Sequence, residues 1–413
     1  MKPKIYTTPA AKTVLNSDKK YKWVHLWTGK EVPPTSGGSF NHLINDILKQ
    51  NLDHLLICQY SAESYRLAES SKASIIYVEF KSKVTFKSRM KHRLTGAHPI
   101  NYEDFLKKSF DVIEKIKCDN IMIWGTPLYL SKLRAAFPKK TIVYNQRYFE
   151  HAYDIANQYD YCDILLTNTI GASKLAFDMN YSVTPLILTI PNGVEIDTFT
   201  PITRDEKNEL KTSLGIEPNK FVIVFPSKLH PYRGISYLLN WIKYFEKENP
   251  KIHFLVMGDW TTKNLKGIYK ELNAYLHKTE LVTWIKSIPR RDIPIIYKSA
   301  DVSLMPGVLR DGMSMSAIES LSSGLPVIAT QRGSYSEIIK TDYNGILCKP
   351  ENLFIEGICS IEKLFSNPEL LRAMSLNARE YAIKRLSRQK LLANYKFFFK
   401  GEYTKIDNDL SLP

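Results

Sequence analysis

The chain has 413 residues, of which 44% are hydrophobic and 24% charged, and its formal net charge at pH 7 is +15. This length favours two domains over a single core, and the composition excludes disordered and fibrous proteins. No apolar run approaches the ~20 residues of a membrane-spanning helix, and no apolar stretch follows the basic N-terminal residues, so we expect neither a transmembrane segment nor a secretory signal. The charge indicates either a lysine-rich solvated surface or contact with polyanions such as nucleic acid, anionic lipid or phosphorylated glycan.

The five cysteines are odd in number and scattered, and none forms a CxxC pair. This pattern excludes zinc and thioredoxin-like motifs and is typical of reduced, buried thiols in a cytoplasmic protein. The histidines show no metal-ligand spacing. We therefore expect no metal centre.

In the first half of the chain, short β-rich apolar runs alternate with longer stretches of helical periodicity. This alternation predicts a parallel sheet with helices on both faces. The strand candidates are WVHLW, HLLICQY, ASIIYVEF, NIMIWG, TIVYNQ, DILLTN and PLILTIP. The helical stretches include SFNHLINDILKQ, YEDFLKKSFDVIEKIK and GASKLAFDM.

The segment Pro191–Pro201, PNGVEIDTFTP, breaks the alternation and reads as a loop because of its prolines and Asn-Gly pair. A second α/β series begins at Phe221, with strand candidates FVIVFPS, HFLVMG, LVTWI, VSLMP, PVIAT and GILC. The domain boundary therefore falls near residue 200. A long helical stretch closes the series, and we expect the polar tail after Tyr403 to be loose.

The segment from Met305 to Thr330 carries the clearest sign of chemistry. An apolar strand ends at Pro-Gly, a loop follows, and Ser314 is placed to cap a short helix that Gly324 ends. In open α/β sheets ligands bind at this edge, and the amides of Met315 and Ser316 would face an anion such as a diphosphate. Asp311 in the loop and Glu319 on the helix can accept hydrogen bonds from hydroxyls on either side of that diphosphate.

Asp311-x7-Glu319, followed by GLPVIAT, resembles the E-x7-E signature of family 4 glycosyltransferases, which have the GT-B fold. The resemblance implies that Glu319 holds the ribose hydroxyls of a nucleotide sugar and that Asp311 contacts the sugar. It also implies donor contacts from the intervening loop and helix start, residues Gly312, Met313, Ser314, Met315 and Ser316. Two departures, Asp311 for Glu and Ser314 for Gly, lie beside the sugar and bear on which sugar is bound.

A second match follows the strand FVIVFP, where the sequence reads SKLHPYRG. It is similar to the family pattern Gly-Arg-Leu-x-x-x-Lys-Gly, whose two cations clamp the diphosphate. The cations are exchanged here, since Lys228 stands for Arg and Arg233 for Lys. The positive charge is kept, but a planar guanidinium and an ammonium do not have the same geometry.

Further matches are weaker individually but extend over nearly the whole chain. The loop segment IPNGVEIDTFTP and the terminal helices resemble those of the family, and Gly37-Gly38 resembles a loop that the family places near donor phosphate and acceptor. At the end of TIVYNQ, where many members have a His, Asn145 stands as a contact to the donor sugar, whereas His151 further on reads as a surface residue. The turn from Ile288 to Arg290 is expected to contact the base.

The resemblance thus predicts an α/β protein of the GT-B class, with two Rossmann-like, doubly wound parallel-sheet domains facing each other across a cleft. Residues 1–195 would form the acceptor-binding domain and residues 196–385 the nucleotide-sugar-binding domain. Residues 386–413 would form a terminal helix that crosses back to the first domain, plus the loose tail.

The predicted reaction is transfer of a sugar from a nucleoside-diphosphate sugar, for which the resemblance implies retention of anomeric configuration. Negative charge would grow on the leaving diphosphate beside Lys228, Arg233 and the helix amides, so no metal or other cofactor is required. With Asp311, these two cations are the candidate catalytic residues. A glycosidase also uses two carboxylates, but it would not need a phosphate site.

Six basic residues and no acidic residue occur between Lys81 and Arg93, interleaved with apolar side chains. This pattern fits an element lying on an anionic membrane, a nucleic-acid contact, or a solvated loop. We expect a cell-surface or lipid-linked glycan as acceptor, and a cytoplasmic enzyme that is peripheral on the inner membrane face if this segment binds lipid. The alternatives are a glycosyltransferase of modified DNA bases and a non-catalytic protein that binds sugar nucleotides or glycans.

Overall fold

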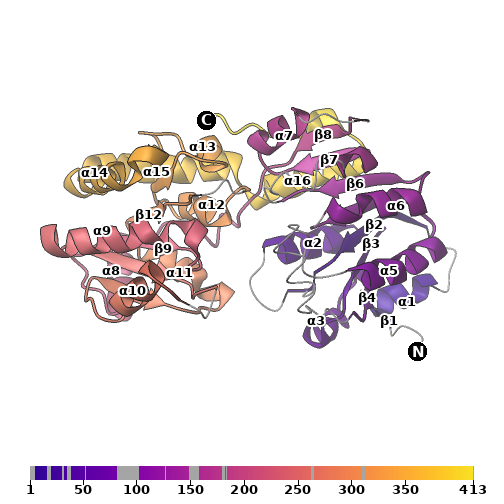
Figure 1. Cartoon of the computed structure of the whole chain (residues 1–413), viewed down its shortest axis with the longest axis horizontal. Helices are drawn as coiled ribbons and strands as arrows, with labels where there is room; N and C mark the ends of the chain where they lie inside the picture. Colours follow the sequence, from indigo (N-terminus) through magenta and orange to yellow (C-terminus); the bar gives the residue numbers. More distant parts are fainter. Residues whose placement is uncertain are drawn as a thin grey trace. The chain divides into compact units, whose positions relative to one another are not determined.

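The computed structural model describes residues 5–15, 20–29, 32–34, 39–51, 53–80, 102–125, 127–147, 158–178, 182, 184–261, 265–308 and 312–412. The chain divides into two compact units, Met1–Thr189 and Ile190–Pro413, each an α/β body (Figure 1). Every strand predicted from the sequence is present in its unit. The division into 1–195, 196–385 and 386–413 stays a prediction.

The first unit contains an eight-stranded sheet with the order β1-β4-β3-β2-β5-β6-β7-β8. The edge strand β1 runs antiparallel to β4, and the other pairs are parallel. Its strands are β1 Ile5–Thr7, β2 Tyr21–Trp27, β3 His54–Gln59, β4 Ser74–Val78, β5 Cys118–Trp124, β6 Thr141–Asn145, β7 Ile164–Thr167 and β8 Leu186–Thr189. Its described helices are α1 Pro9–Leu15, α2 Ser39–Gln50, α3 Ala62–Ala68, α5 Glu103–Lys115, α6 Leu130–Ala136 and α7 Ile170–Phe177.

The second unit contains a six-stranded, fully parallel sheet with the order β11-β10-β9-β12-β13-β14. Its strands are β9 Phe221–Pro226, β10 Ile252–Met257, β11 Val282–Ile285, β12 Val302–Met305, β13 Val327–Thr330 and β14 Gly345–Cys348. Its helices are α8 Arg204–Ser213, α9 Ile235–Glu248, α10 Ile268–Leu276, α11 Ile293–Lys298, α12 Met315–Ser322, α13 Tyr335–Ile338, α14 Leu353–Ser366, α15 Pro368–Arg385 and α16 Arg388–Lys400. Numbered along the chain, the order is 3-2-1-4-5-6, which is typical of dinucleotide-binding folds.

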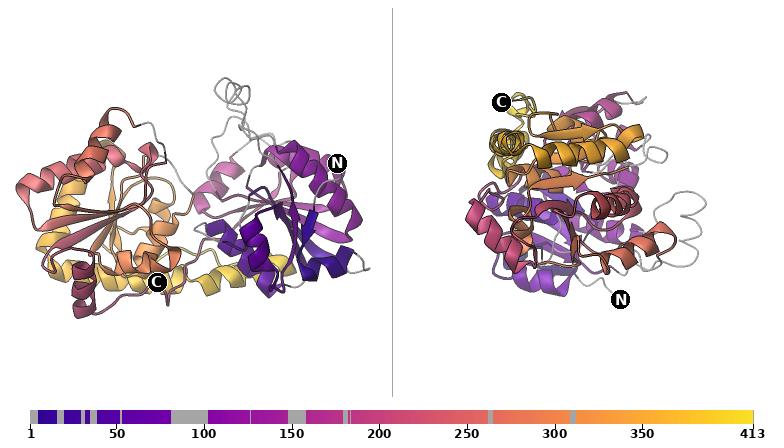
Figure 2. Two further views of the ribbon diagram at one scale, coloured as in Figure 1. Left: turned by 90° about the horizontal axis from the view of Figure 1, so that it is seen from below. Right: turned by 90° about the vertical axis from the view of Figure 1, so that its left-hand side faces the viewer.

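Strand β9 lies at the centre of the second sheet and is buried along its whole length. Because successive side chains of a strand point to opposite faces, Val222 and Val224 join one apolar cluster while Ile223 and Phe225 join another. Helices cover both faces of each sheet (Figure 2). A strand covered on both sides reads as a continuous apolar run, which is why FVIVFP was recognisable in the sequence.

The segment that follows the first unit is irregular, as its turn residues predicted, and it is fixed by the junction between α15 and α16. Val194 N donates to Leu386 O at 2.8 Å, and Arg388 N donates to Val194 O at 2.8 Å. A Cβ on Gly193 would lie 2.5 Å from Ser387 O. A glycine is therefore needed where these two backbones meet.

The C-terminal tail differs from the expectation that it is loose. Asp407 pairs with Lys390 at 2.8 Å, and Asp409 pairs with Arg385 at 3.1 Å. Leu410 is buried in the core of the second unit, and its carbonyl accepts a 2.8 Å hydrogen bond from Tyr381. Polar composition predicted a solvated segment, but its two aspartates lie against basic side chains of α15 and α16, so the tail is held in place.

Gly234, which precedes α9, provides a test of this backbone packing. Its φ is +73°, and a Cβ there would overlap the carbonyl oxygen of Pro306 after β12. Gly215 has the same φ, but a Cβ there would meet no atom within 4 Å. We expect Gly215→Ala to cost about 1 kcal/mol of stability and Gly234→Ala to cost at least about 3 kcal/mol, since overlap adds to strain. Urea unfolding of both variants measures the difference, and equal costs would contradict the close approach.

Candidate functional site

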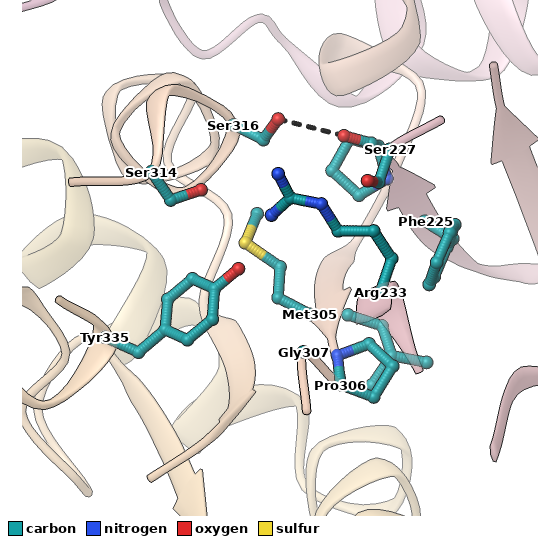
Figure 3. Close-up of a pocket in the computed structure, with 11 residues that line it drawn as sticks. Phe225, Ser227, Arg233, Met305, Pro306, Gly307, Ser314, Ser316 and Tyr335 are labelled. Carbon is teal, nitrogen blue, oxygen red and sulfur yellow. Dashed lines mark hydrogen bonds between the residues drawn. The ribbon is translucent and has the colours of Figure 1, made fainter. Parts of the chain in front are cut away.

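A pocket opens where the strand order of the second sheet reverses, between β9 and β12. The connections from these strands leave in opposite directions, so the backbone at their carboxyl ends is uncovered and ligands commonly bind there. The pocket lies beside the start of α12 (Figure 3). Its lining residues are Phe225, Pro226, Ser227, Arg233, Leu304, Met305, Pro306, Gly307, Ser314, Ser316 and Tyr335.

The amino end of α12 forms one wall of the pocket. Ser314 caps the helix as predicted, because its Oγ accepts a hydrogen bond from Ala317 N at 3.3 Å. The first amides of a helix have no acceptor within the helix, and the helix dipole adds positive potential at this end. The amides of Met315 and Ser316 therefore supply donors suited to an anion.

Two side chains fix the loop ahead of α12. The hydroxyl of Ser334, after β13, accepts from Ser314 N at 3.3 Å and donates to Gly312 O at 2.9 Å. From the other side, Asn192 Nδ2 donates to Met313 O at 2.9 Å, and the Met313 side chain is buried. The loop is thus held in one conformation by partners from β13 and from the connecting segment.

Arg233 supplies the cation of the pocket. It ends a short 3-10 turn, Pro231–Arg233, and its guanidinium points toward the serines at the start of α12, while the hydroxyl of Tyr335 points into the same space (Figure 3). Lys228 is exposed and does not line this pocket. Its backbone packs against Gly258 after β10, where a Cβ would lie 2.9 Å from Lys228 Cα.

Glu319 is buried on α12, one turn beyond the pocket wall. Its Oε2 accepts a 2.9 Å hydrogen bond from the hydroxyl of Tyr297, which is fully buried on α11. Burial raises the pKa of Glu319 to about 7, and it does so although the positive charge of Arg290 and the Tyr297 hydrogen bond both act to lower it. A carboxyl group that titrates near neutrality is typical of functional sites.

The structure brings together most of the predicted residues of the second unit. Gly312, Met313, Ser314, Met315, Ser316 and Glu319 lie along one loop and helix, and Arg233 faces them. Ile288 packs half-buried against the core of this unit, and Arg290 is close enough to act on Glu319. The candidates Gly37, Gly38 and Asp311, with His151 and the segment Lys81–Arg93, lie outside the described residues.

Asn145 belongs to the first unit, at the end of β6. It is buried, and its Nδ2 lies 3.6 Å from Met122 Sδ. Its proposed contact with the donor sugar stays a prediction. Among the described residues no group of three or more His, Cys, Asp or Glu side chains is arranged to hold a metal ion, and the same residues include no helix long and apolar enough to cross a membrane.

Sequence reasoning missed four residues of this region: Tyr297, Ser334, Tyr335 and Gly258. Ser334 and Tyr335 follow β13, and Gly258 follows β10, so their place at the carboxyl ends of parallel strands was a usable signal. Tyr297 offered none, because a tyrosine in the short apolar helix IPIIYK reads as core.

Comparisons with known proteins agree with this geometry. Residues 206–381 match the model of the family described as Glycosyl transferases group 1. The segment 206–381, which holds most of the second unit, is therefore similar to this family. The Escherichia coli enzyme UDP-Gal:alpha-D-GlcNAc-diphosphoundecaprenol alpha-1,3-galactosyltransferase is 30% identical over 199 residues, which cover 47% of this chain and 48% of that enzyme. The chain therefore spans about half the length of this relative.

Solved structures show the fold of this chain. Anabaena HepE in complex with UDP has a TM-score of 0.70 at 18% identity, over 92% of this chain and 100% of that chain. Sucrose-phosphate synthase from Thermosynechococcus elongatus has a TM-score of 0.72 at 13% identity, over 93% and 99% of the two chains. The predicted GT-B class with two parallel α/β sheets is confirmed.

The raised pKa of Glu319 predicts that stability falls as the pH rises. Between pH 4.5 and about 7 the folded chain keeps a proton that the unfolded chain has released, so folding weakens as the pH rises through this range. We expect Glu319→Gln, which stays neutral, to match the wild type at pH 5 and to exceed its stability at pH 8 by on the order of 2–3 kcal/mol. Melting curves without ligand at both pH values test this. An equal change of stability between pH 5 and pH 8 in the two proteins would contradict the prediction.

Proposed function

We propose that this chain is a retaining glycosyltransferase that transfers a sugar from a UDP-sugar to a cell-surface or lipid-linked glycan. The observation that carries the proposal is the pocket between β9 and β12, where Arg233 and the amino end of α12 face one another. A cation and free helix amides in one pocket suit a diphosphate. Uridine is favoured because HepE is described in complex with UDP and the Escherichia coli relative is named as a UDP-Gal enzyme.

The chemistry assigned to the site is stabilisation of a leaving group. The bond between the anomeric carbon and the diphosphate oxygen breaks, and its electron pair stays on UDP. An acceptor hydroxyl oxygen bonds to the anomeric carbon and passes its proton to the departing diphosphate. Arg233 and the amides of Met315 and Ser316 oppose the charge that grows on the diphosphate. Glu319 holds the ribose hydroxyls, and Asp311 contacts the sugar. Lys228 serves as a second cation at the rim.

The acceptor assignment rests on the name of a relative and on sequence composition. The name of the Escherichia coli relative specifies an acceptor linked to diphosphoundecaprenol, which is a lipid carrier. In this chain, the segment Lys81–Arg93 combines six cations with apolar residues, a composition that favours binding to anionic lipid surfaces. Both features support an acceptor presented at a membrane.

The donor is tested by thermal shift with UDP, GDP, ADP and CMP and their sugar conjugates. We expect UDP and one UDP-sugar to raise the melting temperature of the wild type, because ligand that binds only the folded state stabilises it. The increase should shrink in Glu319→Ala, which removes hydrogen bonds to a charged group worth about 1.5–3 kcal/mol. No response to any of these ligands would overturn the proposal.

The role of Arg233 is tested by donor turnover with and without acceptor. Because its charge is needed most as the diphosphate leaves, Arg233→Ala should lower kcat by roughly 10²–10³-fold. Arg291→Ala is the matched control, since the Arg291 side chain is 86% exposed and should leave kcat unchanged. A variant of Arg233 that changed only the donor KM would contradict the assignment.

A further inference from the structure

Glu319 is held in place by Tyr297, a residue that does not line the pocket. Tyr297 has no exposed surface, and its hydroxyl donates to Glu319 Oε2 at 2.9 Å. On the same helix, the hydroxyl of Ser316 donates to Pro226 O at the end of β9 at 2.9 Å. Glu319 is thereby tied to α11, and the start of α12 is tied to β9.

The ring of Tyr297 is itself fixed. It packs edge-on against Phe199, with ring centroids 5.7 Å apart and an interplanar angle of 70°. Phe199 is buried, and its carbonyl accepts from Ser322 Oγ at 2.6 Å and from Arg379 at 2.9 Å. Since the ring has little freedom, the direction of the O–H toward Glu319 is set by packing.

A carboxylate has two oxygens, and their occupation decides what else it can bind. Tyr297 occupies one acceptor position of Oε2, so the carboxylate keeps Oε1 and the second position of Oε2 to accept from ligand hydroxyls. We propose that Tyr297 is a positioning residue of the donor site, whose buried hydroxyl orients Glu319 so that the carboxylate can hold the ribose of the nucleotide. This inference rests on the proposed role of Glu319.

The charges around Glu319 show why such a partner is needed. Burial alone raises the pKa of Glu319, and only Arg290 and Tyr297 oppose that rise. Arg290 lies on the loop before α11, while Arg379 of α15 hydrogen-bonds the far end of α12 at Ser322. Because a protonated carboxyl group cannot accept from two ribose hydroxyls as a carboxylate does, nucleotide affinity should depend on ionisation of Glu319.

Tyr297 can act over the whole working pH range. Its pKa lies well above the usual value because of burial and the neighbouring Glu319, so its hydroxyl keeps its proton and remains a donor. Removing it should therefore raise the pKa of Glu319 further. The loss should appear as weaker UDP binding at pH values where Glu319 of the variant still keeps its proton.

The test is UDP binding to Tyr297→Phe, followed by calorimetry between pH 6 and pH 9. We expect the Kd of the variant to exceed that of the wild type by about tenfold at pH 7 and by less than about twofold at pH 9, where Glu319 ionises in both proteins. Titrations in buffers of different ionisation enthalpy should show that the wild type releases a proton near pH 7 on binding UDP. A ratio of affinities that is constant with pH would overturn the inference.

Tyr381→Phe is the matched control. Tyr381 is also fully buried in the second unit, and its hydroxyl makes one 2.8 Å hydrogen bond, to Leu410 O. This variant loses a comparable buried hydrogen bond and should show the wild-type dependence of UDP affinity on pH. If Tyr381→Phe shifted that dependence as much as Tyr297→Phe, the effect would be a general loss of stability and the inference would fail.

Glu319→Gln separates this inference from the proposed function. Because Gln does not titrate, the pH dependence that remains in this variant is the contribution of the phosphates of UDP, and it can be subtracted. We expect it to bind UDP more weakly at every pH and to lose the step near pH 7. Weaker binding by Glu319→Gln with wild-type behaviour of Tyr297→Phe would overturn only the role of Tyr297. Unchanged binding by Glu319→Gln, or no binding of UDP by the wild type, would overturn both proposals.

Discussion

The reversal of strand order between β9 and β12 is the constraint on which the rest of the second unit depends. Parallel strands need crossover connections, and at this one position the connections on either side turn away from each other. The backbone ends of β9 and β12 are left uncovered, and the chain closes the gap with the Pro231–Arg233 turn and the amino end of α12. This closure is tight, because Gly234 lies against the carbonyl of Pro306 without room for a side chain.

The site combines a loop backbone fixed by hydrogen bonds with the buried carboxyl group of Glu319. The amides of Met315 and Ser316 keep one direction only if the loop Gly312–Ser314 before them holds one conformation. The hydroxyl of Ser334 and the side-chain amide of Asn192 hydrogen-bond the polar groups of that loop and so hold it. Glu319 is in the opposite situation, since burial disfavours its charge. In the proposed function the hydroxyls of the ribose donate to this carboxylate, so donor binding favours the ionised form that burial disfavours.

The sequence predicted the architecture well because the relevant signals are local. All six strands of the second sheet are short apolar runs bounded by turn residues, and the α12 cap follows from a serine before an apolar helix. The missed strand β1 is three residues long and only half-buried, so it carries no such pattern. The C-terminal tail was misjudged for a related reason, because its ion pairs join residues up to 24 positions apart along the chain and leave no local trace.

The partner of Glu319 could not be read from the sequence for a different physical reason. Tyr297 lies 22 positions before Glu319 and on another helix, and only the packing of α11 against its neighbours brings the two together. The same limit applies to Ser334, whose hydroxyl holds a loop 20 residues earlier. Motifs identify groups that meet a ligand, whereas the residues that orient those groups are chosen by tertiary packing and vary in spacing.

The exchange of cations relative to the family pattern has a structural consequence. Arg233 occupies the position nearest α12, so the planar, five-donor guanidinium is the group that lines the pocket, and Lys228 lies at the exposed end of β9. A guanidinium can donate to two oxygens at once, whereas an ammonium on a flexible stem acts as a point charge. In the proposed reaction the directional hydrogen bonds thus come from the wall that faces the helix amides, and the less directional charge comes from the rim. Exchanging Lys228 and Arg233 would restore the family order and preserve the net charge, but it would move the guanidinium away from α12. Charge alone therefore does not define this site.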